Sequence, residues 1–170
     1  MDVLNVELKA RCNDPDRIRK LLNERDAEFI GTDHQVDTYF EIPTGRLKLR
    51  EGTIENNLIF YKRDDTADAK TSDIKLVPFD ETDDIKALLK AALPVQIVVD
   101  KMREIYFLDN VKFHIDKVKQ LGRFIEIEAI DKNNNIGEMT LHQQCKFYRN
   151  LFDIADEDLV ATSYSNLLAD

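Results

Sequence analysis

Apolar and polar residues alternate with a period of two along most of the chain, which is the pattern of β-strands that bury only one face. In the first such segment, residues 3–12, the apolar side consists of Leu4, Val6, Leu8, Ala10 and Cys12, and the polar side of Asn5, Glu7, Lys9 and Arg11. The pattern predicts further strands near 28–42, 45–51, 57–63, 72–79, 95–108, 111–117 and 122–130. We therefore expect about eight strands, each with a charged or polar face.

Helical spacing of apolar residues predicts three main helices. The first, at 15–26, follows the capping sequence Asn13-Asp14-Pro15, in which proline suits the first helical turn. The second begins with a cap at Thr82 or Asp83 and ends near Leu93. The third covers about 137–154 and precedes a short segment ending in YSNLL. Its apolar residues are expected in the core, and they are Met139, Leu141, Phe147, Leu151 and Phe152.

This order of elements favours an α+β fold built on a closed or nearly closed antiparallel β-barrel, because closure removes exposed strand edges. The length of 170 residues fits one such domain, residues 1–170, with the helices packed outside. If the helices cover the apolar outer face, the charged face of each strand points inward. Buried charges are costly unless they are paired or bound to a ligand or metal. The lumen of the barrel is therefore the predicted binding site.

The charge balance argues against one class of function and favours another. The chain has 24 Lys and Arg against 33 Asp and Glu, a formal net charge of -9, whereas a general nucleic-acid binder needs excess positive charge. The acids collect in the expected loops and helix ends, and much of the base falls in the strands. A local basic site in an acidic protein favours a small, highly anionic ligand.

The sequence shows neither the pattern of a membrane-spanning helix nor that of a secretory signal. No apolar stretch approaches the roughly 18 to 20 residues of a membrane span, and the start, MDVLNVELKARC, alternates instead of forming the apolar run of a secretory signal. We expect a cytoplasmic protein that binds neither membrane nor nucleic acid. The two cysteines, Cys12 and Cys145, are too few for a disulfide framework and are expected to be buried free thiols.

Basic residues on four of the expected strands are candidates for binding phosphate. They are Lys9, Lys48, Arg50, Arg63, Lys101 and Arg103. A triphosphate carries about four negative charges near neutral pH, which converging cations offset, arginine with bidentate geometry. The alternative is that these residues are solvated charges on an open sheet. Lys9 has a second candidate role, as a catalytic base, if burial and neighbouring cations favour its neutral form.

Acidic residues on the same faces are candidates for binding a divalent metal. Glu126 and Glu128 share one strand face, and together with Glu7 and Asp116 they offer an all-oxygen site for Mg²⁺ or Mn²⁺. The alternative is that these carboxylates only neutralise the basic residues of the lumen.

Three further side chains are possible substrate contacts. Tyr39 and Tyr61 can stack on a base or bond a ribose, although aromatic residues in strands usually serve packing. His114 shares a strand face with Asp116 and therefore has a plausible place in the site. The other two histidines, His34 and His142, lie in different elements.

Several segments resemble the CYTH superfamily. NVELKAR from Asn5 resembles its E-x-E-x-K signature, with Asn5 in place of the first glutamate. The other segments are similar, in order and spacing, to strand motifs of the class IV adenylate cyclase branch: DTYF from Asp37, LKLRE from Leu47, YKRDD from Tyr61, KMREIY from Lys101, HIDKVKQLGRFIEIE from His114 and SYSNLL from Ser163. The resemblance spans nearly the whole chain.

The resemblance implies a triphosphate tunnel fold and a metal-dependent enzyme that converts ATP to cyclic AMP and pyrophosphate. Hydrolysis of thiamine triphosphate or tripolyphosphate is an alternative, and so is a module that only binds a nucleoside triphosphate, another small triphosphate or polyphosphate. A homodimer is also compatible with the resemblance. Asn5 brings catalysis into question, because an amide is a weaker and neutral metal ligand. An interaction protein that uses its acidic loops is the remaining alternative from a different class.

Overall fold

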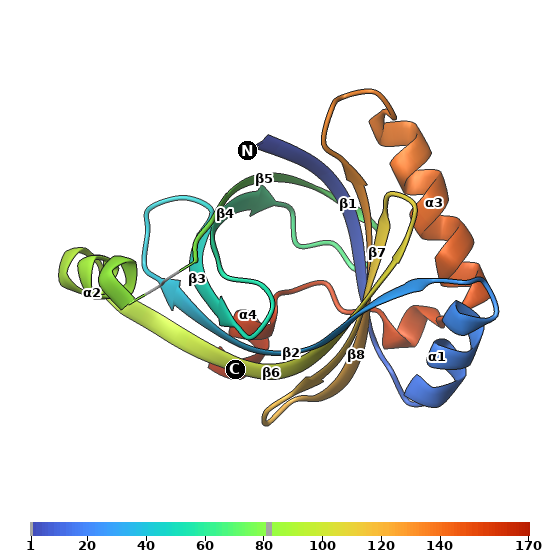
Figure 1. Cartoon of the computed structure of the whole chain (residues 1–170), viewed down its shortest axis with the longest axis horizontal. Helices are drawn as coiled ribbons and strands as arrows, with labels where there is room; N and C mark the ends of the chain where they lie inside the picture. Colours follow the sequence, from blue (N-terminus) through green and yellow to red (C-terminus); the bar gives the residue numbers. More distant parts are fainter. Residues whose placement is uncertain (1, 81–82) are drawn as a thin grey trace.

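Eight antiparallel strands close into a barrel in the order β1-β5-β4-β3-β2-β6-β7-β8 (Figure 1). The structure is a computed structural model that describes residues 2–80 and 83–170. The strands are β1 (Asp2–Arg11), β2 (Glu28–Phe40), β3 (Arg46–Gly52), β4 (Asn57–Arg63), β5 (Lys70–Pro78), β6 (Val95–Leu108), β7 (Val111–Val118) and β8 (Gly122–Asp131). The prediction of a closed antiparallel barrel of about eight strands is confirmed, and each described strand has a partner on both sides.

Four α-helices lie outside the barrel. They are α1 (Pro15–Asn23), α2 (Asp83–Ala92), α3 (Glu138–Leu151) and α4 (Tyr164–Ala169), and a 3-10 helix, η1 (Asp156–Asp158), lies between the last two. The first three match the predicted helices, whereas the YSNLL segment had no helix prediction. No helix in the described ranges is both long and apolar enough to cross a membrane.

The helix ends follow local backbone chemistry. Asp14 caps α1 by accepting a hydrogen bond from the Arg17 backbone N–H at 3.1 Å. Thr82, one of the two predicted caps of α2, lies outside the described residues. Helices α1 and α3 both end about three residues earlier than predicted. Shortly after them, Asp26 and Asp153 have φ angles of 56° and 54°, a left-handed conformation that a right-handed helix cannot include.

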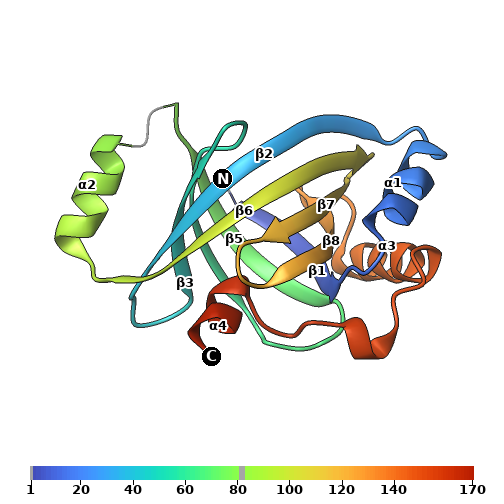
Figure 2. The ribbon, with the colours of Figure 1, turned by 90° about the horizontal axis from the view of Figure 1, so that it is seen from below.

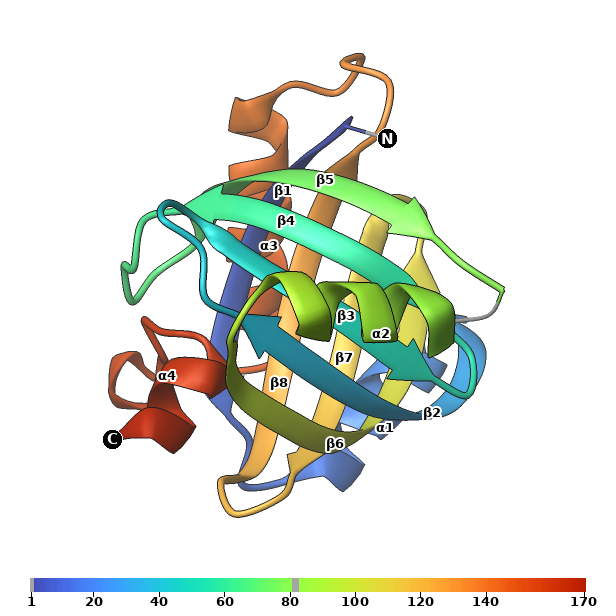
Figure 3. The same cartoon turned by 90° about the vertical axis from the view of Figure 1, so that its left-hand side faces the viewer.

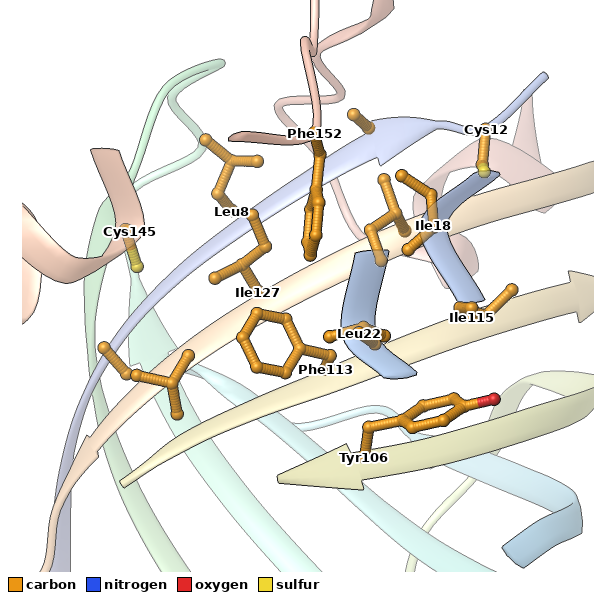
Figure 4. Packing of buried hydrophobic residues seen from close by; sticks show 14 of the residues in the cluster. Leu8, Cys12, Ile18, Leu22, Tyr106, Phe113, Ile115, Ile127, Cys145 and Phe152 are labelled. Carbon is orange, nitrogen blue, oxygen red and sulfur yellow. The ribbon is translucent and has the colours of Figure 1, made fainter. Parts of the chain in front are cut away.

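The main hydrophobic core lies between the outside of the barrel and helices α1 and α3, which flank β1, β7 and β8 (Figures 1 and 2). Figure 4 shows Leu8 and Phe113 of the strands beside Leu22 of α1 and Phe152, and the Phe113 and Phe152 rings meet edge to face with centroids 5.6 Å apart. The apolar face predicted for the first strand is thus the outer face. Consequently, the polar face of the same strand points into the barrel.

Only one side of α3 belongs to this core. Leu141 and Cys145, one helical turn apart, are fully buried, whereas Met139 and Phe147 are 76% and 56% exposed. The prediction that Met139 and Phe147 lie in the core is therefore wrong, because they face away from the barrel. Both cysteines are free and buried, as predicted. Burial raises the pKa of the Cys145 thiol to about 12, and its Sγ donates a hydrogen bond to the Val6 carbonyl at 3.1 Å.

Helix α2 stands apart from the core. Figure 3 shows it crossing in front of β3 and β2, and none of its described residues is buried. A salt bridge between Lys86 Nζ and Glu51 Oε2, at 2.8 Å, connects it to β3. No helix therefore packs closely on the outside of β2 and β3, whereas α1 and α3 pack on the outside of β1, β7 and β8.

Candidate functional site

The inward strand faces surround a cavity of about 620 Å³. Of the residues predicted to form the site, those that line this cavity are Glu7, Lys9, Tyr39, Lys48, Arg50, Tyr61, Arg63, Lys101, Arg103, His114, Glu126 and Glu128. Asp116 is the remaining predicted residue. It shares the inward face of its strand with His114 but does not line the cavity, and its carboxylate contacts Arg103 and Tyr164, which do. The alternation of residues along each strand therefore assigned these side chains to the correct face. We refer to this cavity as the tunnel.

One wall of the tunnel holds three cations around Asp37. The Asp37 carboxylate accepts hydrogen bonds from Lys48 Nζ at 3.0 Å, Lys101 Nζ at 2.9 Å, and Arg50 Nε and Nη2, both at 2.9 Å. Burial by itself would raise the pKa of Asp37, but the charges of Arg50, Lys101 and Lys48 hold it well below its usual range. Burial also lowers the pKa of Lys101 to about 7, although Asp37 opposes this shift. Asp37 is thus the anchor of the predicted cations.

Asp37 was not among the predicted site residues, although it begins the DTYF motif. Its signal was available in the sequence, because it lies two residues before Tyr39 and therefore on the same strand face. The pairing of β2 with β3 then places Asp37 opposite Arg50 and Tyr39 opposite Lys48.

A second ionic cluster joins β6, β7, β8 and α4. Arg103 donates Nε–H and Nη2–H to the two oxygens of Asp116 at 2.7 and 2.6 Å, and Nη2 also contacts Glu126 at 2.9 Å. The hydroxyl of Tyr164 donates to Asp116 Oδ2 at 2.7 Å. Both Asp116 oxygens are therefore engaged, so the structure gives this residue the role of orienting Arg103.

Lys9 lies between an acid and an aromatic ring. Its Nζ is 3.3 Å from Glu126 Oε1 and 3.9 Å from the centroid of the Tyr164 ring. Both neighbours stabilise a positively charged ammonium group. Tyr164 belongs to α4, which the sequence pattern did not predict, so this contact was missed. Its only sequence signal was the SYSNLL similarity.

Three side chains form a group that could hold a cation, and they are His114, Glu126 and Glu128. One ligand atom from each lies within 4.8 Å of the other two. The predicted set contained Glu7 and Asp116 in place of the histidine. Glu7 lies opposite Glu128 in the β1–β8 pair, but its carboxylate forms an ion pair with Arg63. Burial, followed by the charge of Arg103, lowers the pKa of the His114 imidazole.

Several buried polar atoms in the tunnel wall lack a hydrogen-bond partner in the described part of the chain. They are Asn5 Oδ1, Glu7 Oε1, Ser72 Oγ, His114 Nε2, and Nε and Nη2 of Arg63. A buried polar atom without a partner typically costs about 1–3 kcal/mol. Such atoms are expected where a polar ligand completes the structure. Asn5 of β1 is paired in register with Ser72 of β5, so two of these unpartnered polar side chains are neighbours.

Sequence reasoning missed further charged residues in or beside the tunnel, among them Glu55, Lys112 and Lys70. Glu55, in the loop between β3 and β4, forms ion pairs with Lys112 and, at 3.4 Å, with Arg50. Lys112 shares a strand face with His114, a signal that period-2 reasoning could have used. Lys70 was missed because strand β5 was predicted to start at residue 72. Burial, followed by the charges of Arg63 and Lys9, lowers the pKa of Lys70 to about 7.

Comparison with known proteins agrees with this geometry. The CYTH domain model matches residues 4–164. A protein of Methanocaldococcus jannaschii named "putative adenylate cyclase" is 22% identical over 173 residues, covering 97% of this chain and 98% of that protein. The PH1012 protein of Pyrococcus horikoshii OT3 is 26% identical, with a TM-score of 0.81 over 96% of this chain and 98% of that chain.

A more distant structure shares the fold. It belongs to a Hippeastrum protein, described as an adenylyl cyclase homologue with a dominant triphosphatase activity, and it has a TM-score of 0.62 at 11% identity, covering 99% of this chain and 94% of that chain. The family match extends over nearly all strands of the barrel and both ionic clusters of the tunnel. The chain therefore belongs to the CYTH domain family.

Proposed function

We propose that the protein is a divalent-cation-dependent enzyme of the class IV adenylate cyclase type, which converts ATP to cyclic AMP and pyrophosphate. The observation that carries the proposal is the composition of the tunnel. Cations from five strands, β1, β3, β4, β6 and β7, line one cavity, and a group of one imidazole and two carboxylates lines it as well. A triphosphate with a bound cation needs both kinds of surface.

The basic residues would bind and orient the phosphate chain. Arg50 and Arg103 have planar guanidinium groups that are held in place by Asp37 and Asp116, so little ordering is needed when phosphate binds. Lys48 and Lys101 add point charges on the Asp37 side. We assign Lys9 to phosphate binding and not to base catalysis, because its Nζ is held in an ion pair with Glu126 and over the ring of Tyr164.

The carboxylates make a divalent cation necessary for this substrate. Glu126 and Glu128 would repel a triphosphate, because all three groups are anionic. Carboxylate donors fit Mg²⁺ or Mn²⁺, and such a cation, when bound, would supply Lewis-acid stabilisation of negative charge on phosphate oxygens. The aromatic rings of Tyr39 and Tyr61 line the same cavity and are available to the nucleoside part of ATP.

In the proposed reaction, the 3′-hydroxyl oxygen of the ribose attacks the α-phosphorus, the bond from the α-phosphorus to the bridging oxygen breaks, and the hydroxyl proton leaves with the pyrophosphate. The protein's contribution is to hold the chain in line and to exclude bulk water. Water would otherwise compete with the ribose oxygen as the nucleophile.

Hydrolysis is the second candidate. The structural similarity to the Hippeastrum protein with dominant triphosphatase activity supports it. The same residues would bind the phosphates, and water would attack the terminal phosphorus and release orthophosphate. Only the attacking group differs between the two reactions.

The test is to incubate the purified protein with ATP, thiamine triphosphate or tripolyphosphate, each with Mg²⁺ or Mn²⁺, and to resolve the products by phosphorus NMR. Cyclic AMP with pyrophosphate is the expected result. Orthophosphate would establish the second candidate instead. Binding without any product would leave a binding module, with Asn5 as the first residue to examine.

A matched pair of variants tests the mechanism. Replacing both Glu126 and Glu128 by glutamine should abolish turnover, because the carboxylates of the cation group are lost. Replacing Glu157, which lies in η1 outside the barrel, by glutamine should leave turnover unchanged. Full turnover in the double variant would contradict the mechanism, and no binding of any triphosphate would contradict the proposed function.

A further inference from the structure

We propose that His114 is a direct nitrogen ligand of the divalent cation, so that the site is a mixed nitrogen and oxygen centre and not the all-oxygen site expected from the sequence. The proposal rests on the proposed function in one respect: the cation's purpose is to bind the triphosphate. Cation binding itself can be measured without a triphosphate, so the two proposals can fail separately.

The distances within the group suit one ion. His114 Nδ1 lies 3.1 Å from Glu126 Oε2 and 3.5 Å from Glu128 Oε1. Adjacent ligands of an octahedral cation with bonds of about 2.1 Å lie about 3 Å apart, and opposite ligands about 4.2 Å apart. All three separations in the group are at most 4.8 Å. Small side-chain movements would therefore bring the three atoms around one ion.

Strand register makes this arrangement a property of the fold. His114 of β7 is paired with Glu126 of β8, and Glu128 follows Glu126 by two residues on the same face. The three side chains thus project into the tunnel from adjacent strands. Ligands on rigid strands are positioned more accurately than ligands on loops.

The state of the imidazole is a second, independent observation. His114 is 1% exposed, lines the tunnel, and its Nε2 has no hydrogen-bond partner among the described residues. A histidine kept only for structure would be expected to satisfy both of its nitrogens when fully buried. The cation would bind Nδ1, the nitrogen that faces the two glutamates, and the ring proton would then lie on Nε2, which is free to donate it to a polar ligand in the tunnel.

The other acids near the group pair with arginines. Asp116 has both oxygens bonded to Arg103 and one also to Tyr164. Glu7 forms an ion pair with Arg63. Glu126 also pairs with Arg103 and Lys9, but unlike the other acids it lies within reach of both His114 and Glu128. Asn5 offers a neutral amide oxygen and is not part of the group. Among the described acids and histidines, the set that can meet at one cation therefore includes the imidazole.

A nitrogen ligand changes which metal the site prefers. Imidazole suits transition metals, and affinity for divalent ions at such sites rises from Mn²⁺ to Co²⁺ to Ni²⁺. Carboxylates alone suit both Mg²⁺ and Mn²⁺. If His114 is a ligand, its loss should weaken Co²⁺ binding much more than Mg²⁺ binding. If it only orients the glutamates, both affinities should fall together.

The first experiment is pulsed EPR of the full-length protein loaded with Mn²⁺ alone, prepared with ordinary and with ¹⁵N-labelled histidine. The expected result is a nitrogen modulation that changes with the isotope, which identifies a coordinated imidazole. The absence of such a modulation would overturn the proposal. This measurement needs no variant, so it decides the question even if substitution of His114 impairs folding.

The second experiment is calorimetric titration of His114→Gln with Co²⁺ and with Mg²⁺. We expect the Co²⁺ affinity to fall about 10- to 100-fold and the Mg²⁺ affinity to fall clearly less. His142→Gln is the matched control, because His142 lies on α3 outside the tunnel, and its affinities should equal those of the wild type. Equal losses for both metals in His114→Gln would contradict the proposal. A separate titration with tripolyphosphate tests the proposed function independently.

Discussion

The buried carboxylate of Asp33 accepts the backbone N–H of Glu55 at 3.0 Å and thereby holds the β3–β4 loop against β2. The same carboxylate also accepts the N–H of Ile54 at 2.9 Å and the hydroxyl of Thr53 at 3.0 Å. A side chain at Gly52 would lie 2.8 Å from both Asp33 oxygens, so glycine is required at this position. The loop that carries Glu55 into the tunnel is therefore built around one acid.

Replacing Asp33 by asparagine should destabilise the fold. One acceptor oxygen is lost, and buried N–H groups of the loop lose their partner, which typically costs about 1–3 kcal/mol. Urea unfolding followed by circular dichroism measures this loss. Asp73→Asn, at an exposed position of β5, is the control and should stay within about 0.5 kcal/mol of the wild type. Equal stability of the two variants would contradict the role of Asp33.

Replacing Glu55 by glutamine should strengthen the binding of tripolyphosphate. Glu55 neutralises Lys112 and Arg50 and is itself anionic, so its removal frees two cations and removes repulsion of phosphate. We expect the dissociation constant to fall by up to about tenfold, which corresponds to about 1.4 kcal/mol. Isothermal titration calorimetry measures it. Weaker binding would indicate instead that Glu55 holds Lys112 in its productive position.

Lys70 predicts a specific dependence of stability on pH. Its pKa is about 7 in the folded protein, whereas an unfolded lysine has a pKa of about 10.4. Between these values the unfolded chain binds more protons, so this residue makes the protein more stable as the pH rises from about 7 to about 10. Below pH 7 lysine is charged in both states, and the full penalty for burying the charge remains.

Comparison with Lys70→Met isolates this contribution. The unfolding free energy of the wild type, minus that of the variant, should increase between about pH 7 and pH 10 by up to about 1.4 kcal/mol per pH unit. Urea unfolding at several pH values measures the difference, and Lys101, which has a similar pKa, cancels because both proteins contain it. Lys117→Met, at an exposed position of β7, should give a flat difference. A flat difference for Lys70→Met would contradict the lowered pKa.

Two phenylalanines near the end of α3 should differ strongly in their effect on stability. Phe152 is 2% exposed and packs against Phe113, so Phe152→Ala should cost about 3–5 kcal/mol. Phe147 is 56% exposed, so Phe147→Ala should cost about 1 kcal/mol or less. Thermal unfolding monitored by calorimetry compares the two. Similar losses would show that the outer side of α3 is also packed.

The sequence by itself determined the eight strands, the first three helices and the face on which each strand residue lies. Alternation along a strand is a local property, so the inward direction of Lys9, Lys48 and Arg103 could be predicted without any knowledge of the neighbouring strands. The closed barrel followed from the number of strands and the need to protect their edges. The similarity of the motifs to the CYTH superfamily agreed with both.

The tertiary structure alone decided which partner each charge has. Strand register brings Lys9 of β1 against Glu126 of β8, which lies far from it in the sequence, and it brings His114 of the neighbouring strand β7 against the same glutamate. Packing of α4 places Tyr164 on Asp116. Ion pairing and burial depend on these long-range contacts, and a local pattern does not contain them. For this reason the face of Asp116 was predictable, whereas its role beside Arg103 was not.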